Sequence, residues 1–223
     1  MKKCTLALIA VLMISFHAFA QKTKVVIETE YGKIVLALYD GTPKHRDNMI
    51  ALVKKHFYDS LLFHRVIPQF MIQGGDPESK NAKPEAMLGN GDVGYRIPAE
   101  ILDSQYVHKR GALGMARDGN PEKSSSGCQF YIVTGKKFTD QELDNLEIRR
   151  GRKYTAAQRE AYKTEGGSPH LDGNYTVWGE VIEGMDVAQK IGEQPRNSAD
   201  RPNKDIRMLK VYLQKKKKRF LFF

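Results

Sequence analysis

The sequence contains few of the features that anchor a protein in a membrane or reinforce a very small fold. Its 223 residues include one tryptophan and two cysteines, and the longest apolar run, Leu6–Ile14, has nine residues. A bilayer-spanning helix needs roughly 20 apolar residues, so no transmembrane segment is predicted. A composition of 41% hydrophobic and 28% charged residues is typical of a globular protein and excludes collagen-like, low-complexity and coiled-coil chains.

Motifs of covalent, metal-dependent and phosphate-binding catalysis are also absent. There is no His-Glu-x-x-His helix, no Gly-x-x-x-x-Gly-Lys-Ser/Thr loop, no Gly-x-Ser-x-Gly turn and no Cys-x-x-Cys pair. Cys128 and one of the six histidines could form a thiol protease pair, but no cationic neighbour of Cys128 that would activate the thiol is evident. An unreactive thiol is the preferred interpretation.

The N-terminus has the pattern of a secretory signal peptide. Lys2 and Lys3 precede the apolar run Leu6–Ile14, and Ala18-Phe19-Ala20 is a small-x-small site. A buried first helix or a membrane anchor would be the alternative, but the run is too short to span a bilayer. We expect residues 1–20 to be removed and the protein to be exported, to the periplasm or to the exterior. The mature chain would keep only Cys128, so it could form no internal disulfide.

The net charge of +10 lies mainly at the two ends of the chain. Lys2, Lys3 and the run Lys215–Arg219 account for seven of these charges, which leaves +3 for residues 21–214. No long basic stripe is visible, so nucleic acid is not expected as a partner. Residues 215–223 form a basic and apolar tail; attachment to a membrane surface is one interpretation, and a solubilising terminus is the preferred one.

The central part of the chain predicts a mainly-β fold. Two β-rich segments flank the turn Tyr31-Gly32 and indicate a hairpin. A helix is predicted over residues 43–56, with Pro43 at its first position, and a short one over Met185–Ile191. Short segments separated by turns favour an antiparallel sandwich or closed barrel. These segments are Leu62–Ile67, Phe70–Gln73, Tyr95–Ile97, Ala112–Ala116, Gln129–Val133, Thr176–Val181 and Ile206–Leu213.

Residues 137–167 interrupt this pattern of strands. Thr139 with Glu142 and Thr155 with Gln158 have the spacing of capping boxes, and each pair opens a polar stretch. We expect a helical hairpin inserted between two strands, with few apolar positions and light packing on the rest of the fold.

The stretch Phe63–Asp76 has the greatest density of residues suited to a site. It places the guanidinium of Arg65 and the carboxamide of Gln73 on neighbouring predicted strands. Alternate residues of a strand share a face, so Met71 and Gln73 point to one side and Ile72 to the other. Taken singly, Arg65 could be a solvated edge charge and Gln73 a structural hydrogen bonder.

Five sequence blocks together resemble the cyclophilin-type peptidyl-prolyl cis-trans isomerases. The blocks are Phe63–Pro68, Phe70–Asp76, Gly111–Arg117, Gly127–Ile132 and Leu171–Gly173, and the resemblance covers roughly residues 24–214. It implies a closed eight-stranded antiparallel barrel capped by two helices, here with the helical hairpin at 137–167 added. It also implies isomerisation of Xaa-Pro bonds with no metal or organic cofactor.

The resemblance also assigns roles to individual residues. It implies Arg65, Phe70 and Gln73 as catalytic residues. Substrate binding is implied for Met71, Ala116, Arg117, Gln129, Tyr131, Leu171 and Tyr175. The chain departs from many members of the family at several positions. It has Tyr131 for Phe, Arg117 for Asn, Tyr175 for His and His170 for Trp, and it carries the insertion.

Rotation about an Xaa-Pro bond breaks no bond to hydrogen, oxygen or carbon, so the missing motifs do not count against an enzyme. We therefore expect an exported, monomeric prolyl isomerase that acts on proline-containing, unfolded or exposed polypeptide segments and assists folding of exported proteins. The alternative is a non-enzymatic peptide-binding module whose helical insertion docks a partner. Arg65 favours the enzyme, because a pure binder has no use for a guanidinium beside a proline pocket.

Overall fold

A computed structural model describes residues 23–215. The predicted signal peptide and residues 216–223 of the predicted tail lie outside the described residues. Within residues 23–215, no helix has the length and apolar character needed to cross a membrane.

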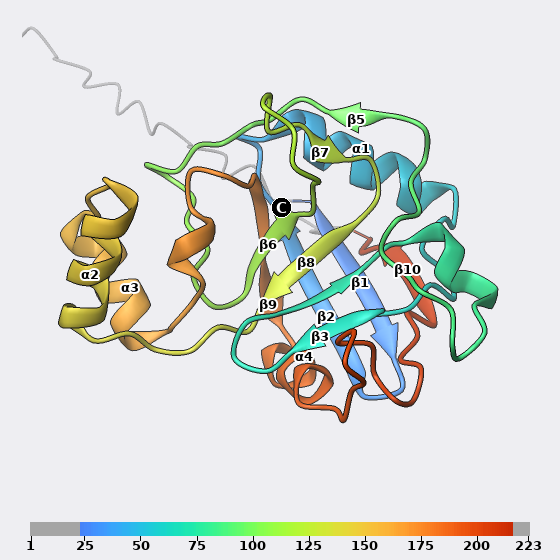
Figure 1. The fold of residues 1–223 in the computed structure, drawn as a ribbon. Helices are drawn as coiled ribbons and strands as arrows, with labels where there is room; N and C mark the ends of the chain where they lie inside the picture. Colours follow the sequence, from blue (N-terminus) through green and yellow to red (C-terminus); the bar gives the residue numbers. More distant parts are fainter. Residues whose placement is uncertain (1–22, 216–223) are drawn as a thin grey trace, which may run out of the picture.

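Eight antiparallel strands form the main sheet (Figure 1). Their order across the sheet is β10-β1-β2-β9-β6-β8-β4-β3. The strands are β1 (Lys24–Thr29), β2 (Gly32–Leu38), β3 (Arg65–Ile67), β4 (Met71–Gly74), β6 (Ala112–Met115), β8 (Phe130–Val133), β9 (Val177–Glu183) and β10 (Lys210–Leu213). A separate small sheet pairs β5 (Arg96–Ile97) with β7 (Ser125–Ser126). The hairpin predicted around Tyr31-Gly32 is confirmed as β1 and β2.

The predicted closure of the barrel is wrong: the sheet is open and curls into a half-barrel. Its edge strands β3 and β10 do not pair with each other within the described residues. Both are shorter than predicted, because the preceding segments leave regular strand geometry. Those segments meet only through the Phe63 N–H, which donates to the Ile206 carbonyl at 2.9 Å, and through a few similar bonds. An isolated bridge between Leu62 and Arg207 marks the same irregular seam.

Residues 23–215 contain four α-helices, which are the two predicted to cap the sheet and the two of the predicted insertion. Helices α1 (Pro43–Lys54) and α4 (Met185–Gly192) match the predicted pair and pack on the sheet, α1 against β9 and β10 and α4 against β2, β3 and β4. Helices α2 (Asp140–Arg150) and α3 (Ala156–Thr164) form the predicted hairpin, and both capping boxes are present. Figure 1 shows this hairpin, here called the arm, to one side of the sheet.

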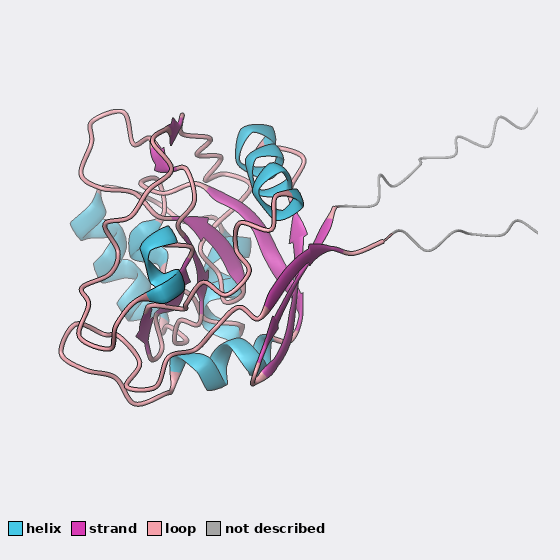
Figure 2. Ribbon diagram, turned by 90° about the vertical axis from the view of Figure 1, so that its right-hand side faces the viewer, coloured by secondary structure: helices cyan, strands magenta, loops and turns pink. Residues whose placement is uncertain are grey.

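The two faces of the curled sheet bury different clusters. The larger core lies on the inner face, where Ile72, Leu113 and Ile132 pack with α1 and α4. A smaller cluster on the outer face includes Met71 and Tyr131. The predicted alternation along residues 71–73 is therefore confirmed, and it directs the candidate site residues outward. Figure 2 shows β1 and β10, the first and last described strands, side by side at one edge of the sheet.

The arm packs more tightly than its polar composition predicted. Leu143 and Tyr162 are fully buried between the arm and the segment that contains Val107. At the base of the arm the backbones of Gly135 and Gly167 almost touch, since a Cβ on Gly135 would lie 1.9 Å from the Gly167 carbonyl oxygen. A few apolar residues are enough to anchor the arm, because Leu143 and Tyr162 are fully buried. Glycine at the base also lets the two backbone segments come close together.

Candidate active site

A row of directly opposed residues crosses four strands of the sheet. Arg65 of β3 pairs with Gln73 of β4, Gln73 with Tyr131 of β8, and Tyr131 with Gly114 of β6. Opposed residues of antiparallel strands project to the same face, so the four share the outer face. Gly114 is needed there, because a Cβ at that position would lie 2.2 Å from Cζ of Tyr131. The missing side chain lets the tyrosine ring lie across β6.

This row forms one side of a small cavity of about 210 Å³. The cavity is lined by nine of the ten residues implied by the sequence: Arg65, Phe70, Met71, Gln73, Ala116, Arg117, Tyr131, Leu171 and Tyr175. Drug-sized ligands occupy roughly 300–1,000 Å³, so this cavity suits a single small ring. Gln129, the tenth residue, lines an adjoining cavity of about 360 Å³ that also includes Gln73, Ala116 and Arg117.

Arg65 stands at the rim of the small cavity with its donors available. Its side chain is 43% exposed, and its one ion-pair partner among the described residues is Asp200, with Nε to Oδ2 at 3.6 Å. No hydrogen bond from the guanidinium to another residue is present within residues 23–215. Arginine remains charged at any physiological pH and carries five N–H donors. The rim therefore holds a cation that can donate to a bound group.

The two glutamines are joined to each other and to the neighbouring loop. The Gln73 side-chain amide donates to Oε1 of Gln129 at 3.1 Å. Gln129 in turn donates to the carbonyls of Gly89 at 3.0 Å and Gly91 at 2.7 Å. Gln129 is therefore a bridge that fixes Gln73. The side-chain oxygen Oε1 of Gln73 makes no hydrogen bond within the described chain.

The backbone of Ala116, one of the residues implied in substrate binding, is already hydrogen-bonded within the protein. Its N–H donates to the Gln129 carbonyl at 2.9 Å, and its carbonyl accepts from the Ser126 N–H at 2.8 Å. The backbone N–H of the next residue, Arg117, makes no hydrogen bond within residues 23–215. Strand-like pairing with an extended peptide is therefore better supported at Arg117 than at Ala116.

The Arg117 side chain is occupied with structural contacts. Its guanidinium donates to the carbonyls of Asn174 at 2.8 Å and Asp118 at 2.9 Å. It also lies over the Tyr175 ring, with Cζ 5.0 Å from the ring centroid. The two departures at these positions are thus coupled: the arginine and the tyrosine form one wall of the cavity together.

Tyr131 is held from behind by a buried hydrogen-bond network that sequence reasoning missed. Nε2 of His108 lies 2.8 Å from the Tyr131 hydroxyl, and Nδ1 lies 2.7 Å from Oδ1 of Asp172. The second carboxylate oxygen of Asp172 accepts from the hydroxyl of Tyr162, which belongs to the arm. His108 and Tyr162 are fully buried, and Tyr131 is almost so.

The protons of this network can be placed from its donors and acceptors. Burial raises the pKa of Tyr131 and of Tyr162 well above the ordinary tyrosine value, so both hydroxyls keep their protons. Every atom is satisfied when Tyr131 donates to Nε2 of His108 and the Nδ1 proton of His108 is donated to Asp172. One signal for the network was present in the sequence: a buried tyrosine where many relatives have phenylalanine needs a hydrogen-bond partner.

The structure also bears on the metal-binding and thiol chemistry that the sequence motifs argued against. Within residues 23–215, no group of three or more His, Cys, Asp or Glu side chains is placed to hold a metal ion. Cys128 is fully buried, and burial raises the pKa of its thiol to about 11, in keeping with the predicted unreactive role.

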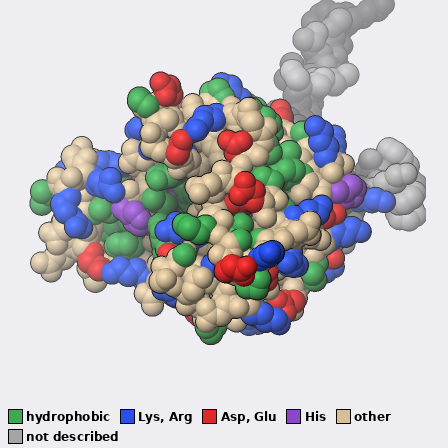
Figure 3. All heavy atoms as spheres, turned by 45° about the vertical axis from the view of Figure 1, so that its right-hand side comes forward, with side chains coloured by type: hydrophobic (Ala, Val, Ile, Leu, Met, Phe, Trp, Pro, Cys, Tyr) green, Lys and Arg blue, Asp and Glu red, His purple; other side chains and the backbone are tan. Residues whose placement is uncertain are grey.

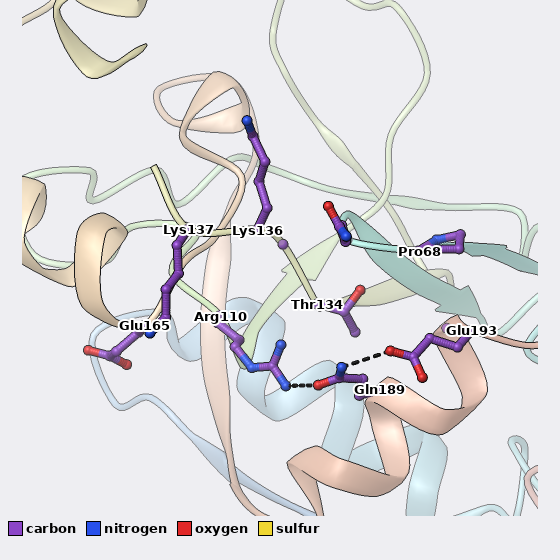
Figure 4. Close-up of a pocket in the computed structure, with 11 residues that line it drawn as sticks. Pro68, Arg110, Thr134, Lys136, Lys137, Glu165, Gln189 and Glu193 are labelled. Carbon is purple, nitrogen blue, oxygen red and sulfur yellow. Dashed lines mark hydrogen bonds between the residues drawn. The ribbon is translucent and has the colours of Figure 1, made fainter. Parts of the chain in front are cut away.

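A further cavity of about 330 Å³ contains none of the predicted site residues (Figure 4). In it Arg110 donates to Gln189, which donates to Glu193 at 2.7 Å. Its central guanidinium is therefore already engaged by the protein, and we place the candidate site at the smaller cavity.

Comparisons with known proteins point to one family. Residues 24–213 match the family profile described as cyclophilin type peptidyl-prolyl cis-trans isomerase/CLD. A Streptococcus pyogenes protein named as a bifunctional phosphatase/peptidyl-prolyl cis-trans isomerase is 36% identical over 82% of this chain, which spans 37% of that protein. A Staphylococcus epidermidis protein named as a peptidyl-prolyl cis-trans isomerase is 32% identical over 82% of this chain and 87% of its own length.

A solved structure supports the same fold. The crystal structure of a Cryptosporidium parvum cyclophilin type peptidyl-prolyl cis-trans isomerase aligns with a TM-score of 0.66 and 24% identity over 88% of this chain and 99% of that one. Together with the family profile and the Staphylococcus relative, this fold confirms what the five sequence blocks predicted: the chain belongs to the cyclophilin-type peptidyl-prolyl cis-trans isomerases, a family of enzymes.

Proposed function

We propose that the protein accelerates rotation about Xaa-Pro bonds in proline-containing polypeptides, with the cavity of about 210 Å³ as its active site. The observation that carries this proposal is the position of Arg65, a largely unpartnered guanidinium at the rim of a cavity of single-ring size that Phe70, Met71 and Leu171 also line. The proline ring occupies the cavity, and the residue before it lies toward Arg65 and Gln73.

The uncatalysed rotation is slow because it interrupts amide resonance, with a barrier of about 18–20 kcal/mol. In the twisted state the prolyl nitrogen becomes pyramidal and gains a lone pair, which the planar amide lacks. An N–H of Arg65 donates to that lone pair only in the twisted state, so it stabilises the transition state more than the ground state. No covalent bond is made or broken and no proton is transferred.

The remaining groups bind the proline ring on one side of the rotating bond and the substrate backbone on the other. Phe70, Met71 and Leu171 bury the ring, which is worth on the order of 1.5–3 kcal/mol of binding. Tyr131 forms the floor and is kept in place by His108. The carbonyl oxygen of Gln73 can accept from a backbone N–H of the substrate, and the backbone of Arg117 can pair with the extended chain. With the ring fixed, rotation takes place on the preceding residue.

We further propose that the protein is exported, acts as a monomer and assists folding of exported proteins. This rests on the signal pattern at residues 1–20 and on the solitary buried Cys128. Intact-mass analysis of the exported form is expected to show a chain beginning at Gln21. In gel electrophoresis this chain should have the same mobility with and without reductant. Retention of residues 1–20 in that fraction would refute export by cleavage.

The isomerase proposal is tested by NMR exchange between the cis and trans forms of an Ala-Pro-containing peptide. We expect cis–trans exchange to be catalysed, with activity flat between pH 6 and 8 because neither Arg65 nor Gln73 titrates there. A peptide that binds but exchanges no faster than in buffer would favour the alternative, a peptide-binding module without catalysis.

A further inference from the structure

The arm carries a second groove beside the candidate active site. Phe138, Leu146, Arg149 and Arg150 line it from the arm, and His170 closes its other side; its volume is about 330 Å³. In Figure 3 the arm lies at the left, where hydrophobic side chains and a histidine gather next to Lys and Arg side chains.

The groove is continuous with the proline cavity through two aromatic rings. The His170 ring lies 5.2 Å from the Phe70 ring, centroid to centroid, and Phe70 lines the cavity. Burial and then the charge of Arg150 lower the pKa of His170, so its ring is neutral at pH 7 and extends the apolar floor. An extended chain advances about 3.3 Å per residue, so a bound peptide passes from one ring to the other within about two residues.

The charges of the arm differ at this groove from those elsewhere on the arm. Arg152, Lys153, Arg159 and Lys163 are each ion-paired with a carboxylate. Within residues 23–215, neither Arg149 nor Arg150 has a carboxylate partner; Arg149 donates only to a carbonyl of its own helix. Among the cations of residues 140–164, the two left without a carboxylate partner are therefore the two that border the apolar groove.

The walls of the groove are fixed relative to the proline cavity. On one side Tyr154 of the arm donates to the carbonyl of Pro169, the residue before His170, at 2.7 Å. On the other, Tyr162 is joined through Asp172 and His108 to Tyr131. A groove held in one position relative to the cavity loses little entropy when a peptide occupies both.

We propose that this groove is a substrate subsite for a residue near the proline, taking an apolar side chain with an adjacent Asp or Glu. The proposal rests on the proposed isomerase function and adds a sequence preference to it. The apolar side chain lies among Phe138, Leu146 and His170, and the carboxylate lies by Arg149 and Arg150. The occupant is the flanking segment of the substrate polypeptide itself.

The test uses an Ala-Pro peptide and versions extended at either end by Leu-Asp, Ser-Asp or Leu-Lys at one to three residues from the proline. We expect Leu-Asp at one end and one spacing to raise kcat/KM about 10-fold over Ser-Asp, the effect of burying one apolar side chain. The kcat/KM of the Leu-Asp peptide should exceed that of the Leu-Lys peptide by about 3- to 5-fold, as for a partly exposed ion pair. Peptide binding, measured by fluorescence anisotropy, is expected to show the same order.

A charge swap separates recognition from a general effect on the fold. Arg150→Glu is expected to reverse the preference, so that Leu-Lys exceeds Leu-Asp, while the unextended peptide is isomerised as before. Lys54→Glu is the matched control, because Lys54 also lies in the last turn of a helix, α1, which is on a different side of the molecule from the arm. The peptide preferences of the Lys54→Glu variant should equal those of the parent.

Equal rates and equal affinities for all extensions in the parent would overturn the subsite, even with the unextended peptide turned over. An unchanged preference in Arg150→Glu would overturn the role of the arginines. If no peptide is isomerised, the proposed function fails, and the anisotropy measurements still decide whether the groove binds as proposed. Binding of Leu-Asp peptides that lack proline with equal affinity would indicate a partner site unrelated to the isomerase cavity and would also overturn the proposal.

Discussion

Two buried histidines lie near opposite ends of the row of residues that crosses the sheet, and they differ in their hydrogen bonding. His64 precedes Arg65 at one end, is 3% exposed, and neither of its ring nitrogens has a hydrogen-bond partner within the described residues. His108 stands behind Tyr131, toward the other end, is also buried, and both of its ring nitrogens are hydrogen-bonded. The two side chains are similarly buried, so they differ in their hydrogen bonds: among the described residues His108 is held in place by two partners and His64 by none.

The same contrast holds for the working groups beside them. Arg65 is half-exposed with one distant carboxylate neighbour, whereas Tyr131 is buried and tied through His108 and Asp172 to the arm. The end that must donate to a transient lone pair is left free, and the end that must hold a ring still is anchored. The predictions that follow test this division.

The largest effect is expected at the free end. Arg65→Ala should lower kcat/KM by roughly 10²–10³, the loss of one preorganised transition-state donor. The free energy of unfolding should hardly change, because the side chain makes no hydrogen bond to any residue that the structure describes. Exchange kinetics and urea unfolding of the same samples measure both quantities.

Arg65→Lys is the control for charge. It keeps the cation but loses the fork of donors, so its activity should lie between those of the parent and the alanine variant. An alanine variant that works as fast as the parent would show that the guanidinium has no part in the rotation.

The next effect concerns His64 and pH. Burial lowers the pKa of His64 to about 4, against an ordinary value of 6.5. Between these values the unfolded chain binds a proton that the folded protein does not, so stability is complete above pH 6.5 and falls as the pH drops toward 4. The loss from this residue amounts to about 3 kcal/mol at most.

His64→Leu isolates this contribution. The variant has no proton to take up, so parent and variant should differ in pH dependence by about 2–3 kcal/mol between pH 7 and 4. Urea unfolding at a series of pH values gives the difference directly. Parallel curves would mean that His64 is protonated equally in the folded and unfolded states, and the contrast with His108 would then lose its basis.

A smaller effect is expected at the anchored end. Tyr162→Phe removes the donor from the arm to Asp172 and should cost about 1.5–3 kcal/mol of unfolding free energy, as for a hydrogen bond to a charged group. KM for a short proline peptide should rise a few-fold as Tyr131 loosens, with kcat nearly unchanged.

Tyr154→Phe is the matched control for the arm. Among the described residues its hydroxyl binds the carbonyl of Pro169 alone, so the change should cost about 1 kcal/mol and leave KM as it was. If both variants weaken the protein equally and neither alters KM, the network supports the arm without acting on the pocket.

Much of this arrangement could be predicted from the sequence, and what could not has a common physical origin. Capping boxes and turn residues are local signals, and they located α2 and α3 correctly. The alternation of Met71, Ile72 and Gln73 likewise predicted which face carries the site. Motif resemblance brought together nine of the ten proposed residues around one cavity.

The features that were missed depend on contacts between distant segments. Closure of the sheet depends on how residues 60–63 meet 206–208, and neither segment shows this by itself. Substrate binding was implied for Ala116, but its backbone groups are hydrogen-bonded to Gln129 and Ser126, which come from a different segment of the chain. The polar arm was expected to pack lightly, since the link from Tyr162 to Asp172 joins two residues that have no common pattern in the sequence.

The smallest effect is expected at Asp200, the carboxylate nearest to Arg65. The pair is partly exposed and its atoms lie 3.6 Å apart, so it should be worth less than about 1 kcal/mol. Asp200→Asn is the suitable change, because Asp200 has φ of 61° and asparagine tolerates that left-handed conformation. It also keeps the backbone carbonyl that accepts from the Val66 N–H at 2.9 Å. We expect kcat/KM to stay within about 3-fold of the parent. A loss as large as that of Arg65→Ala would show that the guanidinium must be held by Asp200, and both ends of the row would then count as anchored.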